Sequence, residues 1–109
     1  MGVTKTDGFT EVQNRRAVVF KALGHPARIA IIEMLIKKQA CICNDMVEEL
    51  PLSQSTISQH LRELKEVGII KGEIEGTSVC YCINEKVWEE IHVDFEQFFG
   101  SYKNVDSCC

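Results

Sequence analysis

The stretch SQSTISQHLRELKEVG, residues 53–68, has the pattern of one amphipathic helix. Its apolar residues recur at i, i+4 and i+7, the spacing that places side chains on one helical face: Ile57, Leu61 and Leu64. Ser53 is a favoured N-cap residue, and Gly68 is typical of the end of a helix. The sequence therefore predicts a helix that packs by one side and presents hydrogen-bonding side chains on the other.

A short helical segment precedes this stretch. Asn44 or Asp45 can cap a helix that runs to Leu50, and Pro51 disfavours its continuation. A short helix, a tight turn and a second helix with a polar face are typical of a helix-turn-helix. The polar face of the second helix can then read the edges of DNA bases.

Two further helices are predicted before this pair, and one after it. Residues 11–23 show helical apolar spacing and end at GHP, while residues 26–36 are apolar on nearly all sides, which indicates a central, buried helix. The final helix, residues 87–102, has a wide aromatic stripe that needs a partner.

After Gly68 the period changes to strict alternation over residues 70–74 and 79–83, with Gly76 at the turn, which predicts a two-stranded wing. Alternation places Val79, Tyr81 and Ile83 on the packed face of the second strand. Cys80 and Cys82 fall on the opposite face, where we expect surface residues without a function.

The fold class is therefore mainly α with a small two-stranded β-wing, a winged helix-turn-helix. We expect a flexible arm over residues 1–10, one folded domain over residues 11–102 and a flexible tail over residues 103–109 that ends in Cys-Cys. Neither a signal peptide nor a membrane-spanning run is recognisable, which predicts a cytoplasmic protein without a membrane partner. In a reducing compartment, six cysteines favour metal or redox ligands over a disulfide framework.

The net charge of −4 is unevenly distributed. Residues 1–84 carry ten Lys or Arg and ten Asp or Glu, whereas residues 85–109 carry two and six. This balance excludes a general polyanion binder, so DNA binding depends on a specific element. An enzyme is not expected, because no nucleophile has a base and an orienting group in a known local pattern.

The combination of LGHPAR (23–28) with STISQHLRELKEVGII (55–70) and a C-x-C pair resembles the ArsR/SmtB family of metal-responsive winged-helix repressors. The resemblance implies a homodimer paired through its terminal helices, bound to a palindromic operator and released by an inducer. In the branch that responds to arsenite and antimonite, a C-x-C pair stands at the start of the first helix of the helix-turn-helix. Cys41 and Cys43 match those positions, so the resemblance implies repression of an arsenical-resistance operon.

The chemistry of these thiols agrees with that implication. Soft ions such as As(III) and Sb(III) select thiolates, and a helix N-terminus favours the thiolate form. Cys41 and Cys43 precede a helix, and a tail sulfur from Cys108 or Cys109 could complete their site. Cys80 and Cys82 lie about 7 Å apart along a strand, which is poorly suited to sharing one ion. A four-thiolate zinc site built from both C-x-C pairs is an alternative.

The expected contacts form two sets, and no organic cofactor or protein substrate is implied. The residues expected at DNA lie on the second helix and the wing: Ser53, Gln54, Ser55, Thr56, Ser58, Gln59, His60, Arg62, Lys65 and Lys71. The residues expected at the dimer interface are Val12, Val19, Trp88, Ile91, Phe95, Phe98 and Phe99. His25, beside Pro26, is expected to cap a helix.

Two other functions remain compatible with the same sequence. The first is a repressor of this fold that senses thiol oxidation or persulfides through a reversible disulfide, or one that responds to cadmium, lead or zinc. The second is an interaction module without DNA affinity.

Overall fold

The computed structural model describes residues 8–38, 50–75 and 78–103. Over these residues the chain forms helices α1 (Glu11–Leu23), α2 (Pro26–Lys38) and α3 (Gln54–Val67), strands β1 (Ile70–Glu75) and β2 (Ser78–Ile83), and helix α4 (Glu85–Gly100). This is the predicted winged helix-turn-helix. The predicted short helix over residues 44–50 and the wing turn at Gly76 lie mostly or wholly outside the described residues.

The helices begin at residues that satisfy their first backbone donors. Thr10 forms a capping box with Gln13, in which each side chain bonds to the other residue's backbone N–H. Ser53 caps α3 as predicted, because its hydroxyl accepts from the N–H of Thr56. Gly68 ends α3 with a φ of 92°, a left-handed conformation that glycine adopts without strain.

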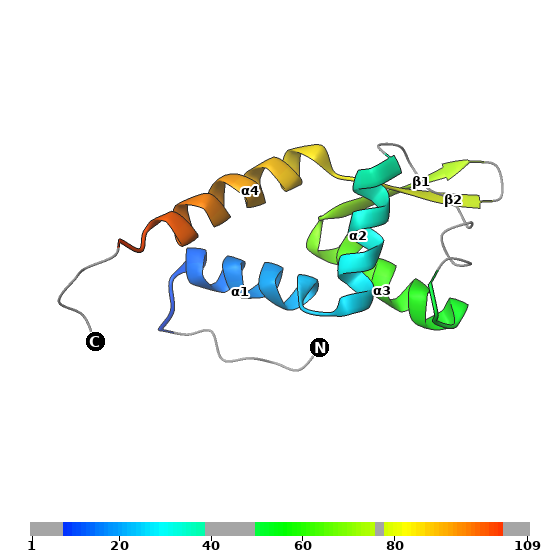
Figure 1. Cartoon of the computed structure of the whole chain (residues 1–109), viewed down its shortest axis with the longest axis horizontal. Helices are drawn as coiled ribbons and strands as arrows, with labels where there is room; N and C mark the ends of the chain where they lie inside the picture. The colour runs from blue at the N-terminus through cyan, green and yellow to red at the C-terminus, as the bar shows by residue number, and fades with distance from the viewer. Residues whose placement is uncertain (1–7, 39–49, 76–77, 104–109) are drawn as a thin grey trace.

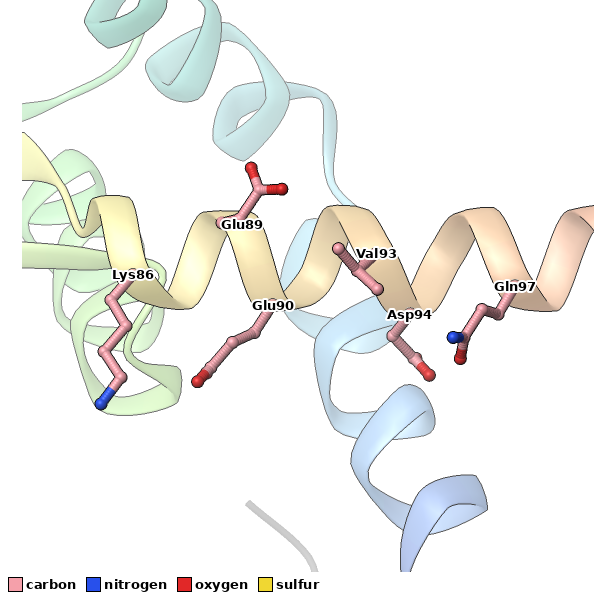
Figure 2. A pocket seen from close by; sticks show the side chains of 6 residues that line it. All are labelled: Lys86, Glu89, Glu90, Val93, Asp94 and Gln97. Atoms are coloured by element: carbon pink, nitrogen blue, oxygen red, sulfur yellow. The ribbon is translucent and has the colours of Figure 1, made fainter.

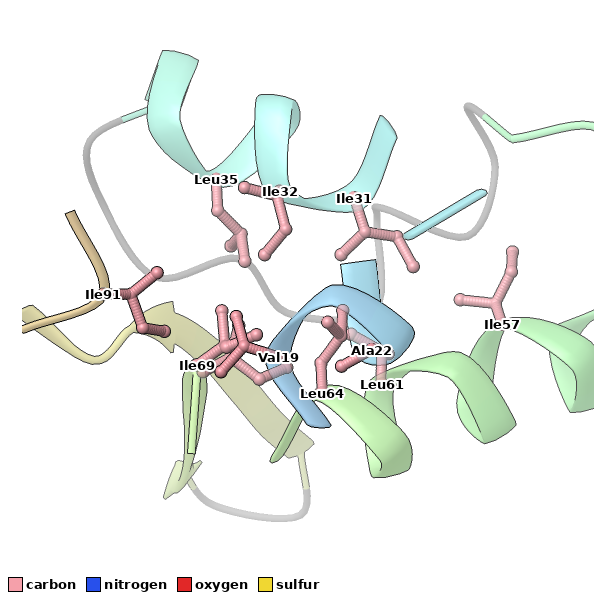
Figure 3. Packing of buried hydrophobic residues seen from close by; sticks show 11 residues of the cluster. Val19, Ala22, Ile31, Ile32, Leu35, Ile57, Leu61, Leu64, Ile69 and Ile91 are labelled. Atoms are coloured by element: carbon pink, nitrogen blue, oxygen red, sulfur yellow. The ribbon is translucent and has the colours of Figure 1, made fainter. Parts of the chain in front are cut away.

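All described elements contribute to one hydrophobic core (Figure 3), in which side chains from α2 meet those of α1, α3, β1 and α4. Ile31 and Leu35 of α2 are fully enclosed, which confirms α2 as the central helix. The core comprises Val19, Ala22, Ile31, Ile32, Leu35, Ile57, Leu61, Leu64, Ile69, Ile70 and Ile91. No helix among the described residues is long and apolar enough to cross a membrane.

The two strands form an antiparallel hairpin in which Ile70 pairs with Ile83 and Lys71 with Cys82. The two strands were predicted correctly, but the distribution of burial between the two faces of β2 was not, since Val79, Tyr81 and Ile83 are only half-buried. Cys80 is 1% exposed, although the pattern placed it on the outer face. The prediction was wrong because the hairpin has neighbours from two elements, since α3 contacts β1 and α2 contacts β2.

Helices α1 and α4 lie side by side at the end of the molecule away from the hairpin (Figure 1), and side chains fill the space between them. The rings of Phe20 and Phe95 stack with their centroids 4.6 Å apart. The guanidinium of Arg16 donates two hydrogen bonds of 2.9 Å to the carboxylate of Asp94. These contacts fix α4 against α1 across a sequence separation of 78 residues.

Candidate nucleic-acid interface

The outer face of α3 is a continuous row of exposed polar side chains, as the sequence predicted. Gln54, Ser55, Ser58, Gln59 and Arg62 are all exposed. The amide of Gln59 donates to Glu63 at 3.3 Å and accepts from Arg62 at 3.2 Å. These bonds hold the Gln59 amide in one orientation along the helix.

In the N-terminal turn of α3, hydroxyl side chains form hydrogen bonds with one another. The hydroxyl of Ser53 lies 2.9 Å from that of Thr56 and 3.2 Å from that of Ser55. Ser53 therefore serves α3 chiefly as its cap. Ser55 and Thr56 are exposed at the N-terminal end of α3. In helix-turn-helix proteins, this end of the second helix contacts bases in the major groove of DNA.

His60 lies on the inner side of α3, although the sequence placed it among the DNA contacts. Its residue is 8% exposed, and its Nδ1 accepts a hydrogen bond from Nε–H of Arg28 at 3.0 Å. Burial lowers the pKa of His60, and the nearby His25 and Arg28 lower it further. The neutral imidazole is thus favoured, and its ring packs α3 against α2.

Arg28 of α2 links α3 to the rest of the fold. Besides His60, its guanidinium donates to the backbone oxygen of Ala22 at 3.1 Å and lies 3.4 Å from the carboxylate of Glu63. Arg28 stands in the LGHPAR stretch, but no role for it was predicted, because its partners are distant in sequence. His25, by contrast, caps α2 as expected, since its Nδ1 accepts from the N–H of Ala27.

The positive residues near α3 border the wing. Arg62, Lys65 and Lys71 are exposed as predicted. The ammonium of Lys65 lies over β1, because a Cβ added at Gly72 would be 3.4 Å from its Nζ. Gly72 thereby leaves room for Lys65 and for the ring of Tyr81, its cross-strand partner.

The predicted metal ligands Cys41, Cys43, Cys108 and Cys109 lie outside the described residues. Within residues 8–38, 50–75 and 78–103, no group of three or more His, Cys, Asp or Glu side chains is placed to hold a metal ion. Cys80 and Cys82 are both disulfide-bonded. These two cysteines were expected to be surface residues without a function, so their bonding is a second difference from the sequence prediction.

The outer face of α4 carries a hollow that extends along this one helix (Figure 2), lined by Lys86, Glu89, Glu90, Val93, Asp94 and Gln97. Nearby, the imidazole of His92 lies 3.4 Å from Glu96 and 3.9 Å from Glu89. All of these residues come from α4, so they form an open, charged helix face.

The residues predicted at a dimer interface fall into three groups by exposure. Val19 and Ile91 are buried in the core of the chain itself, 2% and 9% exposed, and both belong to its hydrophobic cluster. Trp88 and Phe95 are half-buried, while Val12, Phe98 and Phe99 are exposed. The exposed group, together with Phe9, Phe20 and Tyr102, leaves an aromatic surface over α1 and α4.

Known proteins share both this sequence and this fold. Residues 25–71 match the family model of the bacterial regulatory proteins of the arsR family. An HTH-type transcriptional regulator of Methanocaldococcus jannaschii is 39% identical over 83 residues, which cover 74% of this chain and 92% of that protein. The chain belongs to the ArsR/SmtB family. It is a DNA-binding transcriptional regulator and not an enzyme.

A second relative shares the sequence, and a solved structure shares the fold. The repressor SmtB of Mycobacterium tuberculosis is 37% identical over 71 residues, which cover 65% of this chain and 52% of that protein. An ArsR-like regulator from Rhodococcus sp. RHA1 has the same fold, with a TM-score of 0.71 and 22% identity over 84% of this chain and 86% of that one. The chain thus spans about half the length of SmtB but most of the smaller relatives.

Proposed function

We propose that this ArsR/SmtB regulator is a homodimeric, cytoplasmic repressor that binds operator DNA through α3 and releases it when As(III) or Sb(III) binds to cysteine thiolates. The observation that carries the DNA-binding part is the exposed polar face of α3, capped at Ser53 and held from behind by Arg28. A helix that presents hydrogen-bonding groups and is fixed by its inner face suits insertion into a major groove.

The side chains on this face have the chemistry for base recognition. A glutamine amide can bond to both edge groups of an adenine, and an arginine can do the same with guanine. Gln59 and Arg62 stand three residues apart and are bonded to each other at 3.2 Å, so they form one recognition unit. Lys65 and Lys71 would then contact phosphates beside it.

The aromatic surface over α1 and α4 supports the dimer. Phe99 and Tyr102 are 65% and 75% exposed, and the neighbouring Phe98 and Phe20 are also open to solvent. An apolar surface of this kind on a small domain is typical of a protein interface. A two-fold dimer would present two α3 helices to successive major grooves of a palindromic site.

The inducer is inferred from the sequence and from relatives. Cys41 and Cys43 stand directly before the predicted first helix of the helix-turn-helix, where their ligation would act on the segment that supports α3. An arsenical resistance operon repressor of Staphylococcus xylosus is 25% identical to this chain, and a cadmium resistance regulatory protein of Staphylococcus aureus is 38% identical over 71 residues. The C-x-C pattern of Cys41 and Cys43 favours arsenic or antimony over cadmium as the inducer.

Fluorescence anisotropy with labelled DNA from the region upstream of the chain's own gene tests DNA binding. The Arg62→Gln variant should reduce the slope of log affinity against log salt by about 1, the value for one lost phosphate contact, or weaken sequence preference if Arg62 reads a base. Lys103→Gln, which removes an exposed cation beyond α4, is the matched control and should change neither. If the chain binds no site in that region, its proposed function as a repressor is refuted.

The inducer is tested in the same assay under reducing conditions. Arsenite should lower the operator affinity of the wild-type chain by about 5- to 150-fold, the usual range of allosteric coupling. The Cys41→Ser/Cys43→Ser double variant should bind DNA and no longer respond. Continued release of this variant by arsenite would place the inducer elsewhere.

A thiol redox sensor is the second candidate function. Its specific support is the disulfide bonding of Cys80 and Cys82. A structure titled reduced HlyU from Vibrio cholerae has the same fold, with a TM-score of 0.62 and 26% identity over 80% of this chain and 90% of that one. Release of the operator by peroxide, with no response to arsenite in reducing buffer, would favour this function.

A further inference from the structure

The carboxylate of Glu63 lies between the inner side of α3 and the polar face that is proposed to read DNA. Its Oε2 is 3.4 Å from Nη2 of Arg28, whose side chain is only 14% exposed. Its Oε1 accepts a hydrogen bond of 3.3 Å from the Nε2–H of Gln59, which is exposed on the polar face. One side chain therefore joins the contacts of Arg28 to the outer surface of α3.

The charges on the two sides of the Gln59 amide determine which way it points. An ionised carboxylate only accepts hydrogen bonds, whereas a guanidinium only donates them. Glu63 therefore requires the NH2 group of Gln59 on its side. Arg62 donates to the Oε1 of Gln59 at 3.2 Å and requires the carbonyl oxygen on the other side. A reversed amide would place oxygen against the carboxylate and NH2 against the guanidinium, so this set of contacts permits one orientation.

Arg28 is the fixed end of this series of contacts. Its guanidinium also donates to Nδ1 of His60 at 3.0 Å and to the backbone oxygen of Ala22 at 3.1 Å. Ion pairs on a helix surface usually contribute little, partly because two long side chains lose conformational freedom in forming them. Here Arg28 is already restrained by its other partners. Glu63 therefore pairs with a cation of fixed position, and less side-chain entropy remains to be lost when Gln59 binds DNA.

The Gln59 amide keeps the two groups that an adenine requires. Its Nε2 carries two hydrogens, of which Glu63 accepts one, and its Oε1 has two lone pairs, of which Arg62 uses one. One N–H and one lone pair remain. In the major groove, adenine presents N7 as an acceptor and its N6 amino group as a donor, which together match that pair. Guanine presents two acceptors, N7 and O6, and leaves the amide oxygen without a donor.

We infer that Glu63 is a positioning residue that makes Gln59 specific for adenine in the major groove. This inference rests on the proposed function, in which α3 binds operator DNA, and adds the residue that sets a base preference. Glu63 acts through the Gln59 amide, because its charge keeps the amide from reversing. With a neutral side chain at position 63, both orientations of the amide become accessible, and only one of them matches adenine.

In vitro selection from a random DNA library tests the inference on the full chain. Gln59→Ala identifies the base pair that Gln59 reads, because the preference at that position should disappear. The wild-type chain should prefer adenine to guanine there by about 5- to 150-fold, the range for a good bidentate contact. Glu63→Gln should lower this ratio by about twofold or more in each half-site, the loss expected when the amide is reversed half of the time.

Glu66→Gln is the matched control, because it removes the same charge from an exposed carboxylate three residues further along α3. Both variants lose one negative charge near the phosphates and should bind all DNA somewhat more tightly. Only Glu63→Gln should change the ratio between the adenine and guanine sites. A smaller folded fraction would weaken binding to both sites equally, so the ratio measures positioning and not stability.

Modified DNA tests the same contact on the wild-type chain without any substitution. At the position that Gln59 reads, 7-deazaadenine lacks the N7 acceptor and unsubstituted purine lacks the N6 amino group. Each should weaken binding about fivefold, the usual effect of one unpaired hydrogen-bonding group. A preference in Glu63→Gln equal to that of Glu66→Gln, or no loss with either analogue, would overturn the role of Glu63. A wild-type chain that selects no sequence would instead remove the proposed function.

Discussion

The Nε–H of Arg28 donates a 3.0 Å hydrogen bond to Nδ1 of His60, and this bond joins α2 to the recognition helix α3. The same guanidinium reaches the backbone of Ala22 in α1 and the carboxylate of Glu63 in α3. Its side chain is 14% exposed, so these contacts are largely shielded from water. One side chain thus sets the position of α3 against the two helices behind it.

Replacement of Arg28 should destabilise the fold and weaken DNA binding together. Arg28→Gln leaves part of the charge-assisted network unpaired, which we expect to lower the free energy of unfolding by about 1–3 kcal/mol. Arg28→Lys should restore little, because an ammonium lacks the planar fork that serves several acceptors at once. Urea unfolding measures both variants.

Arg62→Gln is the matched control, since it removes an exposed arginine from the same region. It should change the unfolding free energy by less than about 0.5 kcal/mol, as is usual at exposed positions. Equal stability of the wild-type chain and Arg28→Lys would show that the geometry of the guanidinium is unimportant here.

Stability should fall as the pH drops below the ordinary pKa of histidine, because of His60. Burial, followed by the electrostatic interactions with His25 and Arg28, lowers its pKa in the folded chain, and the interaction with Glu63 raises it. Between the lowered pKa and the ordinary value of 6.5, the unfolded chain binds more protons. The free energy of unfolding therefore rises with pH over this interval. The contribution of the neutral His60 to stability is complete above it.

The His60→Gln variant isolates this effect, because glutamine can still accept a hydrogen bond from Arg28 but does not titrate. Its urea midpoint should depend less on pH than that of the wild-type chain between pH 5 and 7.5, a window that brackets the usual histidine range of about 6.5. His92→Gln, at an exposed histidine of α4, is the control. Identical pH profiles for the wild-type chain and His60→Gln would exclude His60 as the source.

The sequence predicted the order of the described elements because each carries a local signal. Ser53 and Gly68 mark the ends of α3 by backbone chemistry that depends on few neighbours. The apolar run of α2 likewise needs no tertiary information to indicate burial. The polar face of α3 followed from the same periodicity, so the candidate DNA surface was predicted together with the fold.

What the sequence missed depends on contacts between distant segments. His60 was expected at DNA because it lies within the helix that carries the polar face, but it stands three residues after Ile57 and four before Leu64, on the apolar side. Its bond to Arg28, 32 residues earlier, could not be read from the sequence. Cys80 was expected outside because alternation identifies two faces of a strand but not whether both are covered. Val19 was expected at the dimer interface, because an apolar stripe does not separate core from interface.

The ion pair between Arg16 and Asp94 should support the orientation of α4 at neutral pH. The hydrogen bonds from Arg16 lower the pKa of Asp94, so the folded chain keeps the carboxylate charged below the ordinary value of 3.8. Its contribution to stability is present above that value and is lost as the pH falls through the lowered pKa. Asp94→Asn should therefore lower the Tm at pH 7, with a smaller effect in acid.

Thermal unfolding followed by circular dichroism over a pH series checks this expectation. Glu90→Gln removes a carboxylate one turn earlier on α4 and should leave the Tm nearly unchanged. If Asp94→Asn and Glu90→Gln have the same small effect at pH 7, the contact with Arg16 does not hold α4 in place.

The aromatic surface should form the dimer interface, and a substitution of Phe99 tests this. Its ring is 65% exposed, yet it is held in place by Phe98 and Phe95, with centroids 5.3 and 6.1 Å away. A rigid, exposed aromatic ring is typical of a residue that dominates an interface, and its truncation costs about 2 kcal/mol or more, roughly a 30-fold increase in dissociation constant. Sedimentation equilibrium of Phe99→Ala measures that increase.

Val93→Ala is the matched control, because Val93 is 45% exposed on α4 and lines the hollow along this helix (Figure 2), which includes none of the aromatic residues. It should leave the dimer intact. Operator affinity should fall in Phe99→Ala at low protein concentration and recover as the concentration rises. The reason is that two linked α3 helices bind DNA more tightly than the single α3 helix of a monomer. If the wild-type chain sediments as a monomer both free and bound to the operator, the proposed dimer is refuted. If Val93→Ala is a monomer, the interface lies on the other face of α4.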